Sequence, residues 1–259
     1  MGTAVVTGAS SGLGRELALL LAARGERVVA VARSADAIAE LASTSPRIEA
    51  VVADLSTPQG RGELADAVGD VDILVNNAGF ASSGPFADTT REVSDRMVEV
   101  NVVALTDLTA RWLPGMVARG AGRVVNVAST AAFQPGPMMA VYYATKAYVL
   151  SFTEGIAEEL RGTGVTATAF CPGPFVSGFQ KVAGIEGSRL VAGRRLPSAA
   201  EMARAALSAM DRGVVVAVPG ALNKAGSIAP RFAPRHLVRR VTRRIQSDLE
   251  TGHLDAPRP

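Results

Sequence analysis

The sequence predicts an α/β fold in which one parallel, seven-stranded sheet is doubly wound by helices into a single domain. Short apolar runs rich in β-branched residues alternate with segments of helical periodicity over residues 3–218, as they do in successive βαβ units. A glycine-rich turn at residues 8–14 follows the first run and precedes a helix. With 259 residues, of which 48% are hydrophobic, the chain can bury a large core. No repeat or linker interrupts residues 1–220, so we expect one folded unit followed by a basic extension, residues 221–259.

Composition and charge exclude several classes of protein. A net charge of +3 is too small to indicate a nucleic-acid partner. Cys171 is the single cysteine, and His236 and His253 are the two histidines, so we expect neither an internal disulfide nor a metal site. No apolar run reaches the length of a membrane span. This composition fits a reducing, cytoplasmic setting.

Seven runs are predicted as strands because they are short, apolar and bounded by glycine, proline or polar residues. They cover residues 3–7, 27–32, 48–53, 71–75, 123–128, 164–170 and 214–218. Apolar residues at helical spacing predict helices between them, including one over residues 142–160. Another helix is predicted to start at Thr90 and to break at Pro114. Ser198 and Glu201 have the spacing of a capping box at the start of a later helix.

The turn at residues 8–14 joins a strand to a helix. Glycines at such a junction permit positive φ and let backbone amides approach a phosphate at the positive end of the helix. The spacing is not that of the P-loop, because Leu13 stands where a glycine should precede a lysine. It also differs by one residue from G-x-G-x-x-G. A purely structural turn is the alternative.

Arg33 follows the second predicted strand and favours NADP over NAD. In dinucleotide-binding folds an acidic residue near this point binds the ribose 2′-hydroxyl, whereas an arginine accommodates a 2′-phosphate. Ala32 and Arg33 occupy the position here, and the next carboxylate is Asp36. The alternative is an ordinary solvated surface arginine.

Polar residues follow several of the predicted strands, at the edge where ligands bind in open parallel sheets. Asp54 and Leu55 follow the third strand, residues 76–79 with the sequence N-N-A-G follow the fourth, and Ser129 follows the fifth. Asn101 lies inside an apolar helical stretch, where asparagine is a poor helix former, so we expect its amide to make a specific hydrogen bond.

Tyr142 and Lys146 form a candidate acid/base pair. Residues four apart share one face of a helix, and an ammonium held close to a phenol favours the phenolate and lowers the phenol pKa. The pair alone is a weak signal, because this spacing also occurs by chance.

Taken together, these motifs resemble the classical short-chain dehydrogenase/reductase family over about residues 3–220. Its T-G-x-x-x-G-x-G pattern is met by Thr7, Gly8, Gly12 and Gly14. Its P-G-P-x-x-T element begins at Pro172, and Ser177 replaces the threonine but keeps the hydroxyl. The resemblance is strongest with bacterial reductases similar to the steroid and 3-oxoacyl reductase group. It implies a Rossmann-type dinucleotide-binding and catalytic domain over residues 1–220 and a homodimer or homotetramer.

The resemblance also implies the functional residues. The family's catalytic tetrad falls on Asn101, Ser129, Tyr142 and Lys146. The residues expected to contact NADP are Thr7, Gly8, Ser10, Ser11, Gly12, Leu13, Gly14, Arg33, Asp54, Leu55, Asn77, Ala78, Gly79, Tyr142, Lys146, Pro172, Gly173, Phe175 and Ser177.

The implied activity is hydride transfer between the nicotinamide and a small-molecule ketone or aldehyde, or the reverse oxidation of a secondary alcohol. Tyr142 would protonate the carbonyl oxygen, Ser129 would hydrogen-bond it, and Lys146 would lower the Tyr142 pKa and bind the nicotinamide ribose. Asn101 would hold a water that connects Lys146 to solvent. Tyr143 is a rival for the phenol role, but its spacing fits less well, and we expect a pocket or packing residue.

Two loops and two alternative functions remain open. The apolar loop 133–141 suggests an apolar substrate, and residues 177–197 form a predicted substrate lid. The first alternative is a catalytically silent NADP-binding regulatory protein on the same fold. The second is a membrane-surface reductase that acts on lipid-like substrates and uses its basic extension.

The extension contains a predicted amphipathic helix that starts near Pro234. Its expected apolar face consists of Leu237, Val238, Val241, Ile245 and Leu249. Arginines cover the remainder. Because the stripe lacks the Trp and Phe usual in interfacial helices, we expect it to dock on protein, with the arginines forming a solvated basic face beside the substrate entrance.

Overall fold

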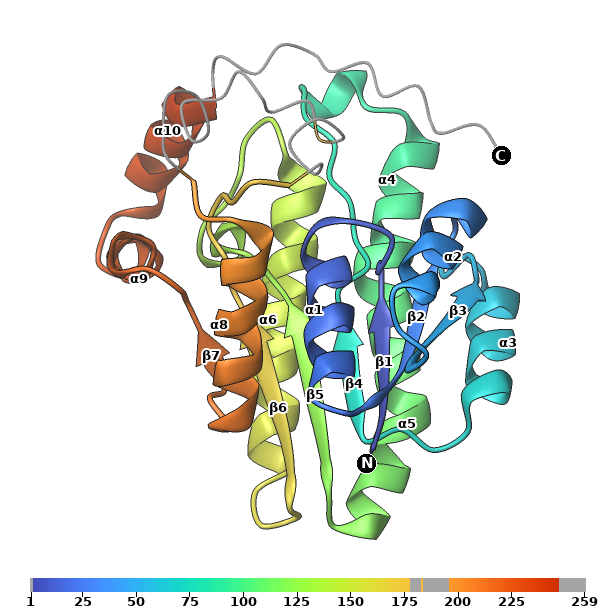
Figure 1. Cartoon of the computed structure of the whole chain (residues 1–259). Helices are drawn as coiled ribbons and strands as arrows, with labels where there is room; N and C mark the ends of the chain where they lie inside the picture. Colours follow the sequence, from blue (N-terminus) through green and yellow to red (C-terminus); the bar gives the residue numbers. More distant parts are fainter. Residues whose placement is uncertain (1, 178–182, 184–195, 247–259) are drawn as a thin grey trace.

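The computed structural model describes residues 2–177, 183 and 196–246. Its core is one sheet of seven strands in the order β3-β2-β1-β4-β5-β6-β7, and every neighbouring pair is parallel (Figure 1). The strands are β1 (Thr3–Thr7), β2 (Arg27–Ala32), β3 (Ile48–Val52), β4 (Ile73–Asn76), β5 (Gly122–Val127), β6 (Val165–Phe170) and β7 (Val216–Ala217). The predicted doubly wound parallel sheet is confirmed, and β7 is shorter than predicted.

Helices cover both faces of this sheet. Apolar residues of α1 (Gly12–Ala23), α2 (Ala35–Ser43) and α8 (Ala199–Asp211) pack on one face. The other face packs against α3 (Pro58–Val68), α5 (Leu105–Arg119) and α6 (Ala140–Glu159). Figure 1 shows α1 and α8 side by side in front of the strands. The alternation of helices and strands places every strand's carboxyl end at one edge, and the strand order reverses between β1 and β4, which is where such folds bind ligands.

The helical region before β5 differs from the prediction. It consists of α4 (Arg91–Val98), a π-helical segment (Glu99–Ala104) and α5, which continues through Pro114 to Arg119. The predicted break at Pro114 is therefore wrong. An interior proline costs about 3 kcal/mol, and the burial of Leu108, Trp112 and Met116 along one side of α5 offsets that cost at about 1.5–3 kcal/mol for each large side chain.

The predicted helix start at Ser198 is confirmed. The Ser198 hydroxyl accepts a hydrogen bond from the Glu201 amide at 3.2 Å, and the Glu201 carboxylate accepts one from the Ser198 amide at 2.7 Å. This reciprocal capping box satisfies amide groups that the first turn of α8 would otherwise leave unpaired.

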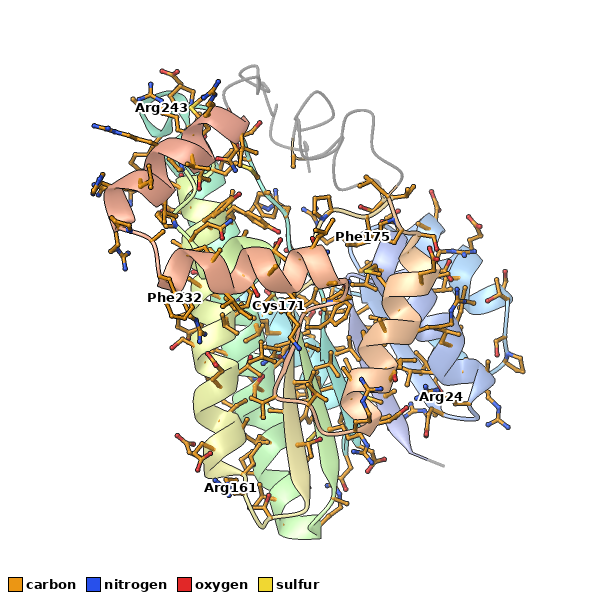
Figure 2. The ribbon with its side chains drawn as sticks, turned by 90° about the vertical axis from the view of Figure 1, so that its left-hand side faces the viewer. Arg24, Arg161, Cys171, Phe175, Phe232 and Arg243 are labelled. Atoms are coloured by element: carbon orange, nitrogen blue, oxygen red, sulfur yellow. The ribbon has the colours of Figure 1, made fainter. Side chains whose placement is uncertain are left out.

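The described part of the C-terminal extension contains two α-helices, α9 (Ala221–Ile228) and α10 (Arg235–Gln246), with a short 3-10 turn at Ala229–Arg231 between them. Figure 2 shows both from the β7 side, with Phe232 at the connection between them and Arg243 on α10. The α9 helix packs against the short helical turn Thr130–Phe133 that follows β5. The extension therefore lies against the carboxyl-end edge of the sheet.

The prediction that α10 docks through its apolar face is confirmed for two of the described residues of that face and wrong for two others. Val238 and Ile245 are partly buried, but Leu237 and Val241 are 48% and 51% exposed. The helix docks instead through two polar residues, which are Thr242 at 7% exposure and Gln246 at 1%. These lie roughly a quarter turn from the apolar stripe. Leu249, the last residue of the predicted stripe, lies outside the described residues.

No helix within the described ranges is long and apolar enough to cross a membrane. Of the predicted lid at 177–197, only Ser177, Ala183, Leu196 and Pro197 belong to the described residues, and the rest of it lies outside them.

Candidate active site

The glycine-rich turn is joined to the strand next to it by a set of hydrogen bonds. The Thr7 hydroxyl is buried and accepts hydrogen bonds from the amides of Asn77 at 3.0 Å and Ala78 at 2.9 Å. In return, the Asn77 side-chain amide donates to the carbonyls of Thr7 at 2.9 Å and Gly8 at 3.1 Å. The first turn and the N-N-A-G element therefore form one rigid wall at the point where the strand order reverses.

The glycine turn has the backbone conformation and the helix start of an anion site. Gly8 and Gly12 have φ of +65° and +54°, which a residue with a side chain rarely adopts. Ser11 is the N-cap of α1, makes no side-chain cap hydrogen bond, and is followed by no acidic residue in the first turn. The first-turn amides of α1, which no side chain of Ser11 caps, and the positive end of the helix dipole thus suit the pyrophosphate of a dinucleotide.

Gly14 allows α1 to approach the turn closely, since a Cβ atom at this position would lie 2.3 Å from the Gly8 carbonyl oxygen. We predict that Gly14→Ala lowers the free energy of unfolding by at least about 1–3 kcal/mol and weakens NADPH binding. Gly62→Ala is the matched control, because nothing lies within 4 Å of a Cβ at this position in α3, and it should stabilise the protein by about 0.5–1 kcal/mol. Thermal unfolding and NADPH titration measure both effects; equal stabilities of the two variants would contradict the close packing.

Arg33 and Asp54 lie near each other at the carboxyl ends of β2 and β3. Arg33 is exposed and makes no salt bridge with a described residue. Burial alone would raise the pKa of Asp54, but hydrogen bonds from Ser56 and attraction by Arg96 and Arg33 hold it below its ordinary value. Leu55 beside it is buried. The pair therefore offers a guanidinium for a 2′-phosphate next to a carboxylate acceptor on the adenine side.

The remaining predicted cofactor contacts surround the same edge. Ser177 lies over the glycine turn, since a Cβ on Gly12 would be 3.6 Å from the Ser177 Cβ. Pro172 accepts a hydrogen bond from the Thr130 amide at 2.9 Å, and Phe175 packs against the core on the α1 and α8 face. Ser10 and Leu13 belong to the turn and first helical residues themselves.

Ser129, Tyr142 and Lys146 meet at the carboxyl end of β5. Tyr142 and Lys146 lie on α6, both buried, and the Lys146 Nζ is 5.8 Å from the Tyr142 ring centroid. The Lys146 ammonium donates to the Val127 carbonyl at 2.7 Å. The side chain of Ser129 makes a hydrogen bond with Tyr142 and accepts one from the Ala131 amide at 3.1 Å. Three groups suited to proton transfer are thus held within one another's reach.

The electrostatics of this group differ from the expectation in one respect. Burial raises the pKa of Tyr142, and the hydrogen bond with Ser129 opposes that rise without reversing it. Burial also lowers the pKa of Lys146 to about 8. The expected lowering of the Tyr142 pKa by Lys146 is therefore wrong for the protein alone, because desolvation disfavours the charged form of both groups and Tyr143 adds to the rise at Tyr142.

Asn101 lies in the π-helical segment and makes the specific hydrogen bonds that its sequence context predicts. Its Oδ1 accepts from the Phe80 amide at 3.1 Å, and its Nδ2 donates to the Phe80 carbonyl at 2.9 Å and the Thr145 hydroxyl at 3.1 Å. A Cβ on Gly79 would be 3.0 Å from the Asn101 Oδ1 and 3.6 Å from the Lys146 Nζ. Asn101 therefore fixes the loop after β4 against α6, and Gly79 leaves space beside the ammonium.

Two residues at this edge were missed by sequence reasoning. The Thr145 hydroxyl accepts a hydrogen bond from the Asn101 side-chain amide. Its position directly before Lys146 was the sequence signal that could have indicated a role at this site. Asn223 of α9 lies against Gly173, where a Cβ would be 2.6 Å from the Asn223 side chain. No feature of the local sequence around Asn223 indicates this contact, because it joins segments far apart in the chain.

An apolar cluster lies beside Tyr142. It combines residues from the loop after β4, from α4, from the loop 133–141 and from the start of α6. Its members include Phe80, Ala81, Met97, Met138, Met139, Val141, Tyr142 and Tyr143. The proton-transfer group is thus bordered by side chains that favour apolar molecules.

Comparisons with known proteins agree with this geometry. The family model described as short chain dehydrogenase matches residues 2–185. The chain is 36% identical over 176 residues to the uncharacterized oxidoreductase YvrD of Bacillus subtilis, which covers 66% of this chain and 67% of that protein.

Two solved structures match nearly the whole chain. A short-chain dehydrogenase from Sphingobium yanoikuyae in complex with NADPH has a TM-score of 0.79 and 32% identity, covering 97% of this chain and 98% of that one. The bulky-bulky ketone specific alcohol dehydrogenase from Comamonas testosteroni has a TM-score of 0.74 and 30% identity, covering 98% and 96%. With its glycine turn, its Ser129–Tyr142–Lys146 group and these matches, the chain belongs to the short-chain dehydrogenase family and is an oxidoreductase of that family.

Proposed function

We propose that this protein is an NADPH-dependent reductase of apolar ketones or aldehydes, which also oxidises the corresponding alcohols. The observation that carries the proposal is the group formed by half-buried Ser129 and buried Tyr142 and Lys146 beside the apolar cluster. A group that donates a proton to a carbonyl oxygen needs a hydride donor for the carbonyl carbon, and NADPH supplies that hydride when bound.

Each of the three residues has a task that its surroundings support. Tyr142, whose pKa is raised by burial, carries a proton at neutral pH and donates it to the carbonyl oxygen as that oxygen gains negative charge. Ser129 donates a hydrogen bond to the same oxygen and stabilises the developing alkoxide. Lys146, in its ammonium form, stabilises the phenolate that remains and binds the nicotinamide ribose.

Preference for NADP rests on Arg33. Its exposed guanidinium stands at the end of β2 with no carboxylate immediately before it, and the NADPH complex of the Sphingobium yanoikuyae relative supports the same choice. Thr7, the glycine turn, Asp54 and the residues around Pro172 would hold the rest of the dinucleotide.

Preference for apolar substrates rests on the cluster beside Tyr142. The bulky-ketone specificity stated for the Comamonas testosteroni relative supports it. The test is NADPH consumption with lipophilic ketones, aldehydes and 3-oxoacyl thioesters, each paired with a short polar analogue. We expect kcat/KM to rise with the apolar area of the substrate at about 25 cal/mol per Å² of surface buried. Faster turnover of the polar member of each pair would contradict the proposal.

The raised pKa of Tyr142 predicts opposite pH dependences for the two directions. Reduction needs the protonated phenol, which persists through neutral pH when burial raises the pKa, so kcat/KM for reduction should stay flat there. Alcohol oxidation needs the phenolate, so the logarithm of kcat/KM for oxidation should rise with pH at a slope of about one. Initial rates in both directions across a buffer series measure this. A reduction rate that climbs through neutral pH would contradict it.

The two alternative functions are not favoured. A catalytically silent NADP-binding protein has no need to keep Ser129, Tyr142 and Lys146 together. The second alternative, a membrane-surface reductase, needs the outer face of α10 to contact lipid, and α10 contains none of the Trp and Phe side chains usual in interfacial helices. The homodimer or homotetramer stays a prediction, which light scattering tests. The solvated arginine face beside the substrate entrance also stays a prediction.

A further inference from the structure

Gln246, in the last described turn of α10, has an unusual environment. Only 1% of its surface is exposed, although glutamine is mostly found at protein surfaces. Its Nε2 donates to the Tyr143 hydroxyl at 2.6 Å and touches the Met139 sulfur at 3.8 Å. Its Oε1 is buried and has no hydrogen-bond partner among the described residues. A purely apolar contact would avoid that unpaired oxygen, so the amide needs an explanation.

Tyr143 contacts both Gln246 and the neighbouring phenol of Tyr142. Its ring meets the Tyr142 ring edge-on, with centroids 6.1 Å apart and an interplanar angle of 78°. On the loop 133–141, Gly136 lies so close that a Cβ atom there would be 2.2 Å from the Tyr143 ring. Gln246, Gly136 and Tyr142 thus hold the Tyr143 ring from three directions. A displacement of Tyr143 cannot be absorbed without moving Tyr142 or the loop, because packed side chains leave little free volume.

The chain segments involved are far apart in the sequence. Gln246 and Tyr143 are separated by 103 residues, and α10, near the end of the described chain, meets α6 from its middle (Figure 2). Asn223 of α9 against Gly173 gives the extension a second contact with the same edge of the sheet. The extension therefore touches the site on two sides.

We propose that Gln246 is a positioning residue, which fixes the Tyr143 ring through its hydrogen bond and thereby orients the Tyr142 phenol for proton transfer. This inference rests on the proposed function. It makes the C-terminal helix part of the active site, in addition to any role in stability. It also explains why α10 docks through its Gln246 side and leaves Leu237 and Val241 exposed.

The test is Gln246→Met, which keeps the size of the side chain and removes both polar atoms. We expect kcat for carbonyl reduction to fall by about three- to tenfold, the range that the loss of one hydrogen bond produces, with KM for NADPH unchanged. Tyr143→Phe should give the same loss, and the double variant should be no slower than either single one, because both remove one interaction.

Thr242→Val is the matched control. Thr242 is buried on the same docked side of α10, and valine keeps its shape and removes only the hydroxyl, so the replacement should change the melting temperature while the helix stays docked and kcat stays unchanged. A Gln246→Met enzyme with wild-type kcat, or a double variant in which the two losses multiply, would overturn the inference while the proposed function stands. A wild-type protein that consumes no NADPH with any carbonyl compound would overturn the proposed function and the inference with it.

Discussion

Replacing Tyr142 with phenylalanine is expected to lower kcat for carbonyl reduction by about 10³-fold, within the range that a general acid contributes. The change removes only the hydroxyl that hydrogen-bonds with Ser129 and leaves the ring in its apolar cluster. Binding of NADPH should therefore persist. Stopped-flow turnover and fluorescence titration with NADPH measure the two quantities separately.

Tyr148→Phe is the control for this variant. Tyr148 lies on the same helix, is 40% exposed and shares a hydrogen bond with Thr106, so its hydroxyl is remote from the proton-transfer group. Its loss should leave kcat unchanged. Substantial turnover by Tyr142→Phe, together with an inactive Tyr143→Phe, would assign the acid to the neighbouring tyrosine instead.

Replacing Arg33 with alanine is expected to weaken NADPH binding by about ten- to a hundredfold and to leave NADH binding nearly unchanged. A charge-assisted hydrogen bond to the 2′-phosphate is worth about 1.5–3 kcal/mol, and the exposed Arg33 is free of a salt bridge to any described residue. Kinetic constants measured with NADPH and with NADH give the preference of each enzyme for one cofactor over the other.

Arg47→Ala is the control for the Arg33 variant. Its guanidinium donates to the Gly25 carbonyl at 3.1 Å, at the other end of β2 from Arg33, so the cofactor preference should not change. An Arg33→Ala enzyme that still discriminates between the cofactors as well as the wild type would show that another group recognises the 2′-phosphate.

The sequence predicted the fold and the composition of the site best where the determining forces are local. The order of strands and helices follows from periodicity, and the closeness of Tyr142 and Lys146 follows from helical spacing. The need for glycine at position 14 also follows from the strand–turn–helix junction, although the contact with the Gly8 carbonyl becomes visible only in three dimensions.

The errors arise where distant segments compete with local preference. The packing of Trp112, whose indole donates to the Gly69 carbonyl at 3.0 Å, keeps α5 helical through Pro114. The partner of Gln246 is contributed by a helix from another part of the chain, so the apolar stripe of α10 could not predict its buried side. Desolvation determines the direction of the Tyr142 pKa shift, and burial depth is not readable from residue spacing.

Transfer of deuterium from NADPH that carries deuterium at both hydrogen positions of the reactive nicotinamide carbon is the most direct test of the proposed chemistry. A lipophilic ketone is incubated with the labelled cofactor and either the wild-type enzyme or Tyr142→Phe, and the alcohol is examined by mass spectrometry. We expect one deuterium on the carbinol carbon of the wild-type product and almost no product with the variant. Alcohol formed without deuterium, or equal amounts of labelled alcohol from both enzymes, would contradict hydride transfer assisted by Tyr142.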